Sequence, residues 1–179
     1  MKTTQDIYQK ALKFAGEAHK NQLVPGTEAN YLLHISNVAM EVIFAHKHKA
    51  NFNLDFAVQI AILHDVIEDT EISFTEVADE FSIKIAQAVQ ALSKDKKLEK
   101  NLQLADSLKR IMNQPKEVAI VKLADRITNL QKPPAHWTIE KKKEYLKQAN
   151  NIHKQFASSN KYLANRLQQK IEDYKLNFN

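Results

Sequence analysis

The chain contains no cysteine and has only two glycines and four prolines among its 179 residues. Without cysteine it can form neither a disulfide nor a thiolate metal site, which is compatible with a reducing cytoplasm. Alternating runs of β-branched residues are also absent, so helices are expected to dominate. No stretch approaches the roughly 18 apolar residues that cross a bilayer, and the N-terminal segment lacks the apolar core of a signal peptide. We therefore expect a cytoplasmic protein without a membrane partner.

Positive and negative charges are interleaved along the chain. There are 26 lysines and arginines against 21 aspartates and glutamates, which gives a net charge of +5 and a pI near 9.2. An excess of positive charge favours anionic partners, but proteins that bind nucleic acid usually gather it into one patch or stripe. We therefore expect a small anionic ligand such as a nucleotide, and no nucleic acid. The sequence indicates no oligomeric state.

Apolar residues recur with helical spacing over most of the sequence, and 44% of residues are hydrophobic. This pattern predicts an all-α helical bundle of about eight to ten helices in a single domain that covers residues 1–179. The third helix is expected to run from Asp55 through the His64-Asp65 pair. Ser73 and Phe74 are expected to open a short helix that begins near Thr75, where Thr75 followed by Glu76 offers capping chemistry. The other expected helices cover residues 4–19, 32–47, 82–93, 98–113, a stretch after Pro115 that carries Asp125, 138–157 and 159–176.

The most informative segment runs from His64 to Thr70 and reads HDVIEDT. In a continuous helix His64 would lie over Glu68 and Asp65 over Asp69, because residues four apart share a face. Imidazole together with carboxylate oxygens suits a divalent transition metal better than calcium. Taken alone, the segment also fits an exposed helix end that carries acids, so a metal site needs further ligands from elsewhere.

Two polar residues interrupt helical patterns that should be buried. His34 stands at the head of an apolar run, and Asp125 lies within VKLADRITNL. A buried carboxylate is costly unless it is paired or bound to metal, and Arg126 is the partner that a purely structural role would use. Similarly, His34 alone could be a hydrogen-bonded core histidine. Both residues become candidate ligands when they are considered together with His64 and Asp65.

The ordered set YLLH, HDVIEDT and KLADRITNL resembles the HD superfamily of metal-dependent phosphohydrolases. Within it, the chain is most similar to the guanosine-tetraphosphate hydrolase domain of the Rel/Spo family and its small stand-alone alarmone hydrolases, from about Ile7 to Phe156. The resemblance implies an all-helical fold and removal of the 3′-pyrophosphate from a hyperphosphorylated nucleotide. It also implies a Mn²⁺ ion, or another divalent transition metal, held by four residues: His34, His64, Asp65 and Asp125.

The same resemblance implies roles for residues around the metal. Glu68 and Asp69 would orient and activate the attacking water, and the sequence does not separate their tasks. Substrate contacts are implied for five further residues: Gln22, Lys122, Asn129, Lys141 and Tyr145. On helical spacing, Lys122 and Asn129 share a face with Asp125. Lys122 also fits an ordinary solvated charge, Lys141 fits a polar helix face, and Trp137 fits either a pocket wall or an anchor for the next helix.

One segment departs from the family pattern. Family members carry an Arg-Lys pair shortly before the YxxH motif, whereas here Gln22 is followed by Leu23, Val24 and Pro25. Phosphate groups need cations or N–H donors, so the substrate could be an adenosine counterpart or another pyrophosphorylated nucleotide. A nucleotide phosphatase of the wider superfamily and a non-catalytic nucleotide sensor are the alternatives. The presence of both Glu68 and Asp69 favours an enzyme over a sensor.

Overall fold

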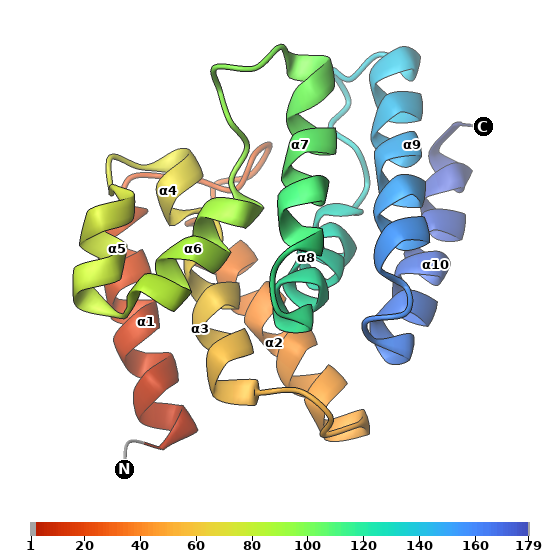
Figure 1. Ribbon diagram of the computed structural model, residues 1–179. Helices are drawn as coiled ribbons and strands as arrows, with labels where there is room; N and C mark the ends of the chain where they lie inside the picture. Colours follow the sequence, from red (N-terminus) through yellow and green to blue (C-terminus); the bar gives the residue numbers. More distant parts are fainter. Residues whose placement is uncertain (1–2, 179) are drawn as a thin grey trace.

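Helices follow one another along the whole of the part of the chain that the computed structural model describes, residues 3–178 (Figure 1). This confirms the predicted all-α class. The helices are α1 (Thr4–Ala18), α2 (Leu32–His48), α3 (Leu54–Leu63), α4 (Val66–Asp69), α5 (Phe74–Glu80), α6 (Ile83–Leu92), α7 (Lys100–Met112), α8 (Lys116–Asn129), α9 (Ile139–Phe156) and α10 (Lys161–Lys175), followed by the 3₁₀ turn η1 (Leu176–Phe178).

Helix α3 lies at the centre and packs against α1, α2, α6 and α8. Seven of its ten residues are buried, and several of them, such as Ile60 and Ala61, have no exposed surface. Helices α9 and α10 pair with each other and close the other side of α8 (Figure 1). As a result, α8 is buried from Glu117 to Ile127. A helix buried on all sides cannot turn a charged residue to solvent, so each of its charged side chains needs an internal partner.

The predicted continuous helix through residue 65 is wrong. Helix α3 ends at Leu63, His64 and Asp65 form a turn, and α4 begins at Val66. The His64 ring explains the break, because its Nδ1 lies 2.8 Å from the carbonyl oxygen of Ala61. That carbonyl is the one that a continuing helix would pair with the N–H of Asp65. The turn places His64 and Asp65 beside each other at the end of α3.

The predicted cap at Thr75 is also wrong. Helix α5 begins at Phe74, and its N-cap is Ser73, whose side chain accepts from the N–H of Glu76 while the Glu76 carboxylate accepts from Ser73. This reciprocal pair satisfies two N–H groups at the helix start. The general expectation of a short capped helix at this point therefore holds, with the cap two residues earlier.

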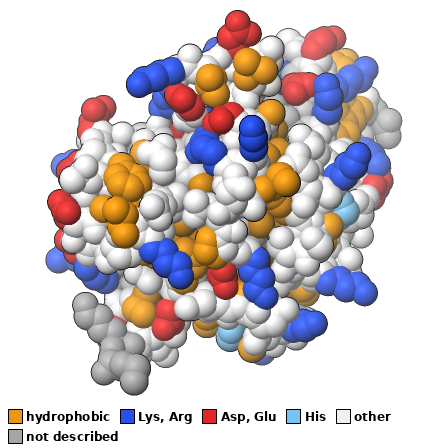
Figure 2. All heavy atoms as spheres, viewed as in Figure 1, with side chains coloured by type: hydrophobic (Ala, Val, Ile, Leu, Met, Phe, Trp, Pro, Cys, Tyr) orange, Lys and Arg blue, Asp and Glu red, His pale blue; other side chains and the backbone are white. Residues whose placement is uncertain are grey.

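The surface agrees with the predicted mixing of charge. On the face drawn in Figure 2, basic and acidic side chains are interspersed and no single basic stripe is visible. Within residues 3–178, no helix has the length and apolar character that a bilayer span requires.

Candidate metal centre

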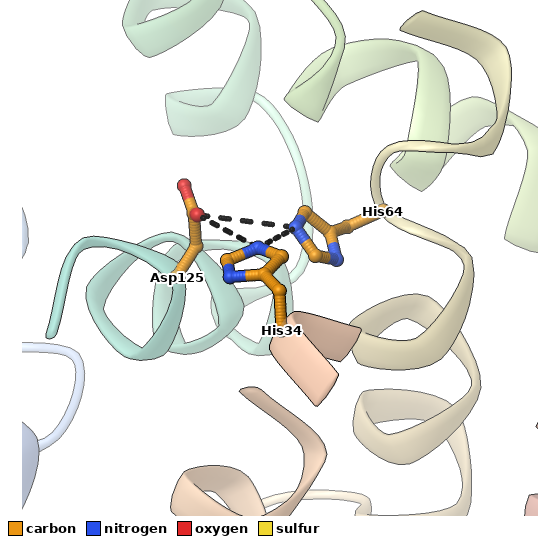
Figure 3. A group of neighbouring side chains, drawn as sticks. All are labelled: His34, His64 and Asp125. Atoms are coloured by element: carbon orange, nitrogen blue, oxygen red, sulfur yellow. Dashed lines mark hydrogen bonds and ion pairs between the residues drawn. The ribbon is translucent and has the colours of Figure 1, made fainter. Parts of the chain in front are cut away.

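Three separate segments bring His34, His64 and Asp125 together. His34 lies in the first turn of α2, His64 directly follows α3, and Asp125 lies in the last turns of α8 (Figure 3). Each offers one donor atom, and these atoms all lie within 4.8 Å of one another. All three residues are buried, with 2 to 6% of their surface exposed. Such burial of imidazole and carboxylate groups needs a compensating partner.

The hydrogen bonds at the far side of each ring fix which nitrogen faces the centre. The Nδ1 of His64 faces the carbonyl oxygen of Ala61, which can only accept, so Nδ1 carries the hydrogen. The Nδ1 of His34 lies 3.4 Å from the hydroxyl oxygen of Thr128, whose own hydrogen is donated to the carbonyl of Asp125. In the neutral form of each ring, the Nε2 atom therefore directs its lone pair into the cluster. This is the usual arrangement for histidines that bind a metal through Nε2.

The donor atoms have the spacing of ligands around one cation. The two Nε2 atoms are 3.2 Å apart, and the Asp125 Oδ1 lies 3.6 Å from the Nε2 of His34 and 3.8 Å from that of His64. Ligands held about 2.1 Å from one ion are separated by about 3 to 3.4 Å. Lone pairs at these distances repel one another unless a positive charge lies between them. The set therefore fits a divalent metal ion.

Asp65 adds a second carboxylate to the same centre. Its Oδ2 lies 2.8 Å from the Nε2 of His64 and 3.6 Å from that of His34, and it accepts a 2.6 Å hydrogen bond from the hydroxyl of Tyr31. Burial alone would raise the pKa of Asp65, but the two imidazoles hold that pKa well below its usual range. For His64, burial opposes protonation, yet Asp65 and Asp125 outweigh it and raise the pKa to about 9. The centre thus has a strong affinity for positive charge.

Asp125 is bound on both sides by residues of its own helix. The Nζ of Lys122 donates to its Oδ2 at 2.9 Å, and the amide of Asn129 donates to its Oδ1. Although burial raises the pKa of Asp125, Lys122 lowers it to about 2. The shared face predicted for Lys122, Asp125 and Asn129 is confirmed. Arg126, considered above as the partner of Asp125, instead stacks over the ring of Tyr145 at 4.4 Å.

The two acids of the HDVIEDT motif differ in their surroundings. Glu68 is partly buried, and its carboxylate accepts from both the backbone N–H of Lys94 at 2.8 Å and its Nζ at 3.0 Å. Lys96 donates to the backbone carbonyl of Glu68. Asp69 is the more exposed of the two acids, and its pKa is raised because neighbouring protein atoms partly desolvate its carboxylate and because Asp65 and Glu68 carry like charges nearby. Glu68 is therefore the acid whose position the fold fixes.

A cavity of about 500 Å³ lies against the cluster and includes His34 and Asn129 among its lining residues. We call it the aromatic pocket, because the side chains of Trp137 and Tyr145 form part of its wall and contact each other edge to face. Trp137 is thus a pocket residue, one of the two alternatives considered for it. Lys141 is exposed and places its Nζ 4.3 Å above the Trp137 ring.

A second cavity of about 550 Å³ extends from Glu68 over the loop that joins α6 and α7. We call it the lysine pocket, since its lining residues include four cations: Lys94, Lys96, Lys97 and Arg110. The contacts of Lys94 and Lys96 with Glu68 connect it to the HDVIEDT motif.

The side chains of two predicted substrate-binding residues are bound to neighbouring side chains. Lys122 is buried against Asp125, and the Gln22 amide oxygen lies 2.6 Å from the Nδ1 of His19. Sequence reasoning also missed Tyr31, which supports Asp65, and Thr128, which supports His34. A usable signal existed for Thr128, which is three residues after Asp125 and so a neighbour on its helix. Tyr31 directly precedes α2, and its bond to Asp65 joins separate segments that no spacing relates.

Comparison with known proteins agrees with this geometry. A family model described as "HD domain" matches residues 11–162. The chain belongs to the HD-domain family. The match includes the three segments that supply His34, His64, Asp65 and Asp125, so the clustering described above lies within the part that defines the HD domain.

Relatives of this HD domain include proteins named as guanosine-3′,5′-bis(diphosphate) 3′-pyrophosphohydrolases. One from Danio rerio is 28% identical over 168 residues, which cover 91% of each chain. Another from Aquifex aeolicus is 28% identical over 151 residues, which cover 81% of this chain and 20% of that larger protein. A solved structure of a metazoan ortholog of SpoT, described as hydrolysing ppGpp, superposes with a TM-score of 0.80 at 25% identity and covers 93% of this chain and 94% of the other.

Proposed function

We propose that this protein is a metal-dependent pyrophosphohydrolase that removes the 3′-pyrophosphate from an alarmone-type nucleotide, such as guanosine tetraphosphate or its adenosine counterpart. The observation that carries the proposal is the convergence of two imidazole Nε2 atoms and two carboxylates at one buried point, in a fold that matches a ppGpp-hydrolysing protein over nearly its whole length. The relatives that carry this enzyme name match almost all of the chain.

In this proposal His34, His64, Asp65 and Asp125 hold one divalent ion, and Mn²⁺ is the metal suggested by the family. Nitrogen and carboxylate ligands together suit the first-row transition metals. When bound, such an ion lowers the pKa of water and neutralises charge that develops on phosphoryl oxygens. Tyr31, Thr128 and Lys122 orient the ligands through the hydrogen bonds described above, as outer partners in metal sites commonly do.

Glu68 is the residue that we assign to the attacking water. A carboxylate that accepts the proton of the attacking water is commonly worth about 10²–10⁴-fold in rate. The two hydrogen bonds from Lys94 hold the Glu68 carboxylate in one orientation and keep it beside a positive charge. Asp69 is the more exposed acid of the pair and supports the same region by its negative charge.

The substrate's nucleoside would occupy the aromatic pocket. Ligand cavities of this size usually combine apolar walls with a few placed polar groups, and here Tyr145 and Trp137 provide the walls while Asn129 lies at the boundary with the cluster. Lys141 stands above Trp137, where it can meet a phosphate from the solvent side. Gln22 and Lys122 act on the site through His19 and Asp125.

The test is to incubate metal-stripped and Mn²⁺-loaded protein with guanosine and adenosine 3′,5′-polyphosphates and to identify the products. Release of pyrophosphate only in the presence of the metal is the expected result. Loss of single phosphates would instead assign the protein to the nucleotide phosphatases of the same superfamily. Tight binding without turnover would identify a nucleotide sensor.

A further inference from the structure

The lysine pocket is separate from the cluster that is proposed to hold the metal. The described residues that line it include Glu68 but none of the four cluster residues, and none of them also lines the aromatic pocket. Its four cations, Lys94, Lys96, Lys97 and Arg110, stand against two acids, Glu68 and Asp95. A hollow whose charges are mostly of one sign concentrates ions of the opposite sign. The lysine pocket therefore attracts small anions.

Three of the four cations already have partners in the protein. Lys94 donates through its Nζ to the Glu68 carboxylate at 3.0 Å, and Lys96 donates to the backbone carbonyl of Glu68. The guanidinium of Arg110 donates to Asp106 at 2.7 Å and to two backbone carbonyls at the end of α6. Arg110 is therefore fixed in the pocket wall, whereas each of the two lysines depends on one contact that a stronger anion can replace.

Lys97 is the fourth cation, and its charge is available to a ligand. Its backbone N–H donates to Asp95 at 2.9 Å, but its ammonium group has no hydrogen-bond or ion-pair partner within residues 3–178. Lys96 and Lys97 are exposed, and Lys94 is partly buried. Lysine ammonium groups bind phosphate as flexible point charges. Three of them in one cavity match an anion that carries several negative charges on its oxygen atoms.

The other lining residues indicate that this anion carries no nucleobase. Ile67 is the only large apolar residue among the described residues that line the lysine pocket, and the same set contains no aromatic side chain. Proteins commonly hold a base by stacking it on an aromatic ring, which this cavity does not offer. Inorganic pyrophosphate has several charged oxygens and no base, and it is the product that the proposed reaction releases.

We propose that the lysine pocket is a second ligand site, which binds inorganic pyrophosphate and lowers turnover when it is occupied. The effect on turnover rests on the proposed 3′-pyrophosphohydrolase activity. Lys94 connects the two sites, because its ammonium group can bind either the Glu68 carboxylate or the anion. When the anion takes this group, the Glu68 carboxylate keeps only the backbone N–H of Lys94 and is held less firmly toward the attacking water.

The first experiment titrates metal-stripped protein with inorganic pyrophosphate in a calorimeter, so that no metal ion holds the ligand. We expect one saturable site, whose Kd rises about tenfold in Lys97→Glu. Lys100→Glu is the matched control, because it makes the same change of charge at an exposed position outside the pocket lining. Absence of saturable binding, an unchanged Kd in Lys97→Glu, or an equal rise in both variants would overturn the site.

The second experiment tests the connection to Glu68 without measuring turnover. Glu68→Gln removes the negative charge that holds Lys94, so metal-stripped Glu68→Gln should bind pyrophosphate about tenfold more tightly than the parent. Asp69→Asn is the control, because it removes the neighbouring charge, which does not line the lysine pocket. An unchanged Kd in Glu68→Gln, or an equal gain in Asp69→Asn, would overturn the competition for Lys94.

The third experiment measures turnover at a fixed concentration of free Mn²⁺, with and without saturating pyrophosphate. Because the base is held less firmly, we expect kcat to fall about threefold and KM to stay the same in the parent and in Lys100→Glu. The fall should be absent in Lys97→Glu. A rise in KM alone would place pyrophosphate in the substrate site and overturn the regulatory role. Failure to release pyrophosphate from any substrate would reject the proposed function, and the two binding experiments would still decide the site.

Discussion

The buried cluster differs in construction from the surface around it that is proposed to bind substrate. We call this surface the substrate side, and it includes Asn129, Lys141 and the loop of residues 23–27. Each cluster residue is held by a neighbour: Tyr31 binds Asp65, Thr128 contacts His34, Lys122 binds Asp125, and the His64 ring donates to the carbonyl of Ala61. On the substrate side, Asn129 and Lys141 are exposed, and the residue 23–27 loop is held mainly by its own backbone. The centre is therefore fixed by packing, whereas the substrate side can change by substitution at the surface. We expect the effects of mutations to decrease in the same order.

The largest effect is expected for Asp65→Ala. This change removes a carboxylate that lies 2.8 Å from the Nε2 of His64 and leaves the Tyr31 hydroxyl without its acceptor. We expect the protein to lose its bound metal and its activity to fall to that of metal-stripped protein. Metal content by atomic emission, measured beside turnover, tests this. Full retention of metal would contradict the assignment of Asp65 as a ligand.

Glu68→Ala removes the carboxylate that is assigned to the attacking water. It therefore separates that role from the metal-binding role of Asp65. Because Glu68 is bound to Lys94 rather than to the imidazoles, the metal is expected to stay while kcat falls about 10²–10⁴-fold. The comparison uses the same metal and turnover measurements as Asp65→Ala, since both variants lose one carboxylate. Equal loss of metal in the two variants would contradict the division of roles.

The difference between the two regions also explains what the sequence could predict. The grouping of His34, His64, Asp65 and Asp125 was predicted because the motifs that carry these residues resemble those of the HD superfamily. Spacing alone placed His34 and Asp125 in segments that should be buried and did not bring the four residues together. The break at His64 was not predictable from periodicity, because apolar residues with helical spacing continue on both sides of it, and the bond from the His64 ring to the Ala61 carbonyl is visible only in the fold. Likewise, Lys122 rather than Arg126 pairs with Asp125 because α8 turns Arg126 toward Tyr145.

The substrate side was less predictable for a physical reason. The contact of Lys94 with Glu68 joins positions 26 residues apart, and no sequence pattern indicated it. Contacts between distant segments depend on how helices pack, which periodicity does not specify. The apolar character of Val24 and Pro25 could be read directly, but their position at the aromatic pocket required the fold.

An intermediate effect is expected for Tyr31→Phe. The change removes one hydrogen bond to Asp65 and leaves the ring packed against His34, whose centroid is 5.2 Å away. Loss of an outer partner commonly weakens metal binding about 10–100-fold, and we expect a value in this range. Titration of metal-stripped protein with Mn²⁺ measures it. Tyr162→Phe also removes only a hydroxyl, from a ring stacked on His48, and should leave the affinity unchanged.

The smallest effect is expected for Lys141→Ala. Its ammonium group is exposed and contacts the face of Trp137, so its interaction with a substrate phosphate is screened by water and salt. We expect KM for the 5′-diphosphate substrate to rise about threefold and kcat to stay the same, which corresponds to about 0.7 kcal/mol. Lys143→Ala on the same helix is the control, because it removes an exposed charge without a Trp137 contact. A large fall in kcat for Lys141→Ala alone would place this lysine at the reacting phosphate, and the substrate side would then be as sensitive to substitution as the buried cluster.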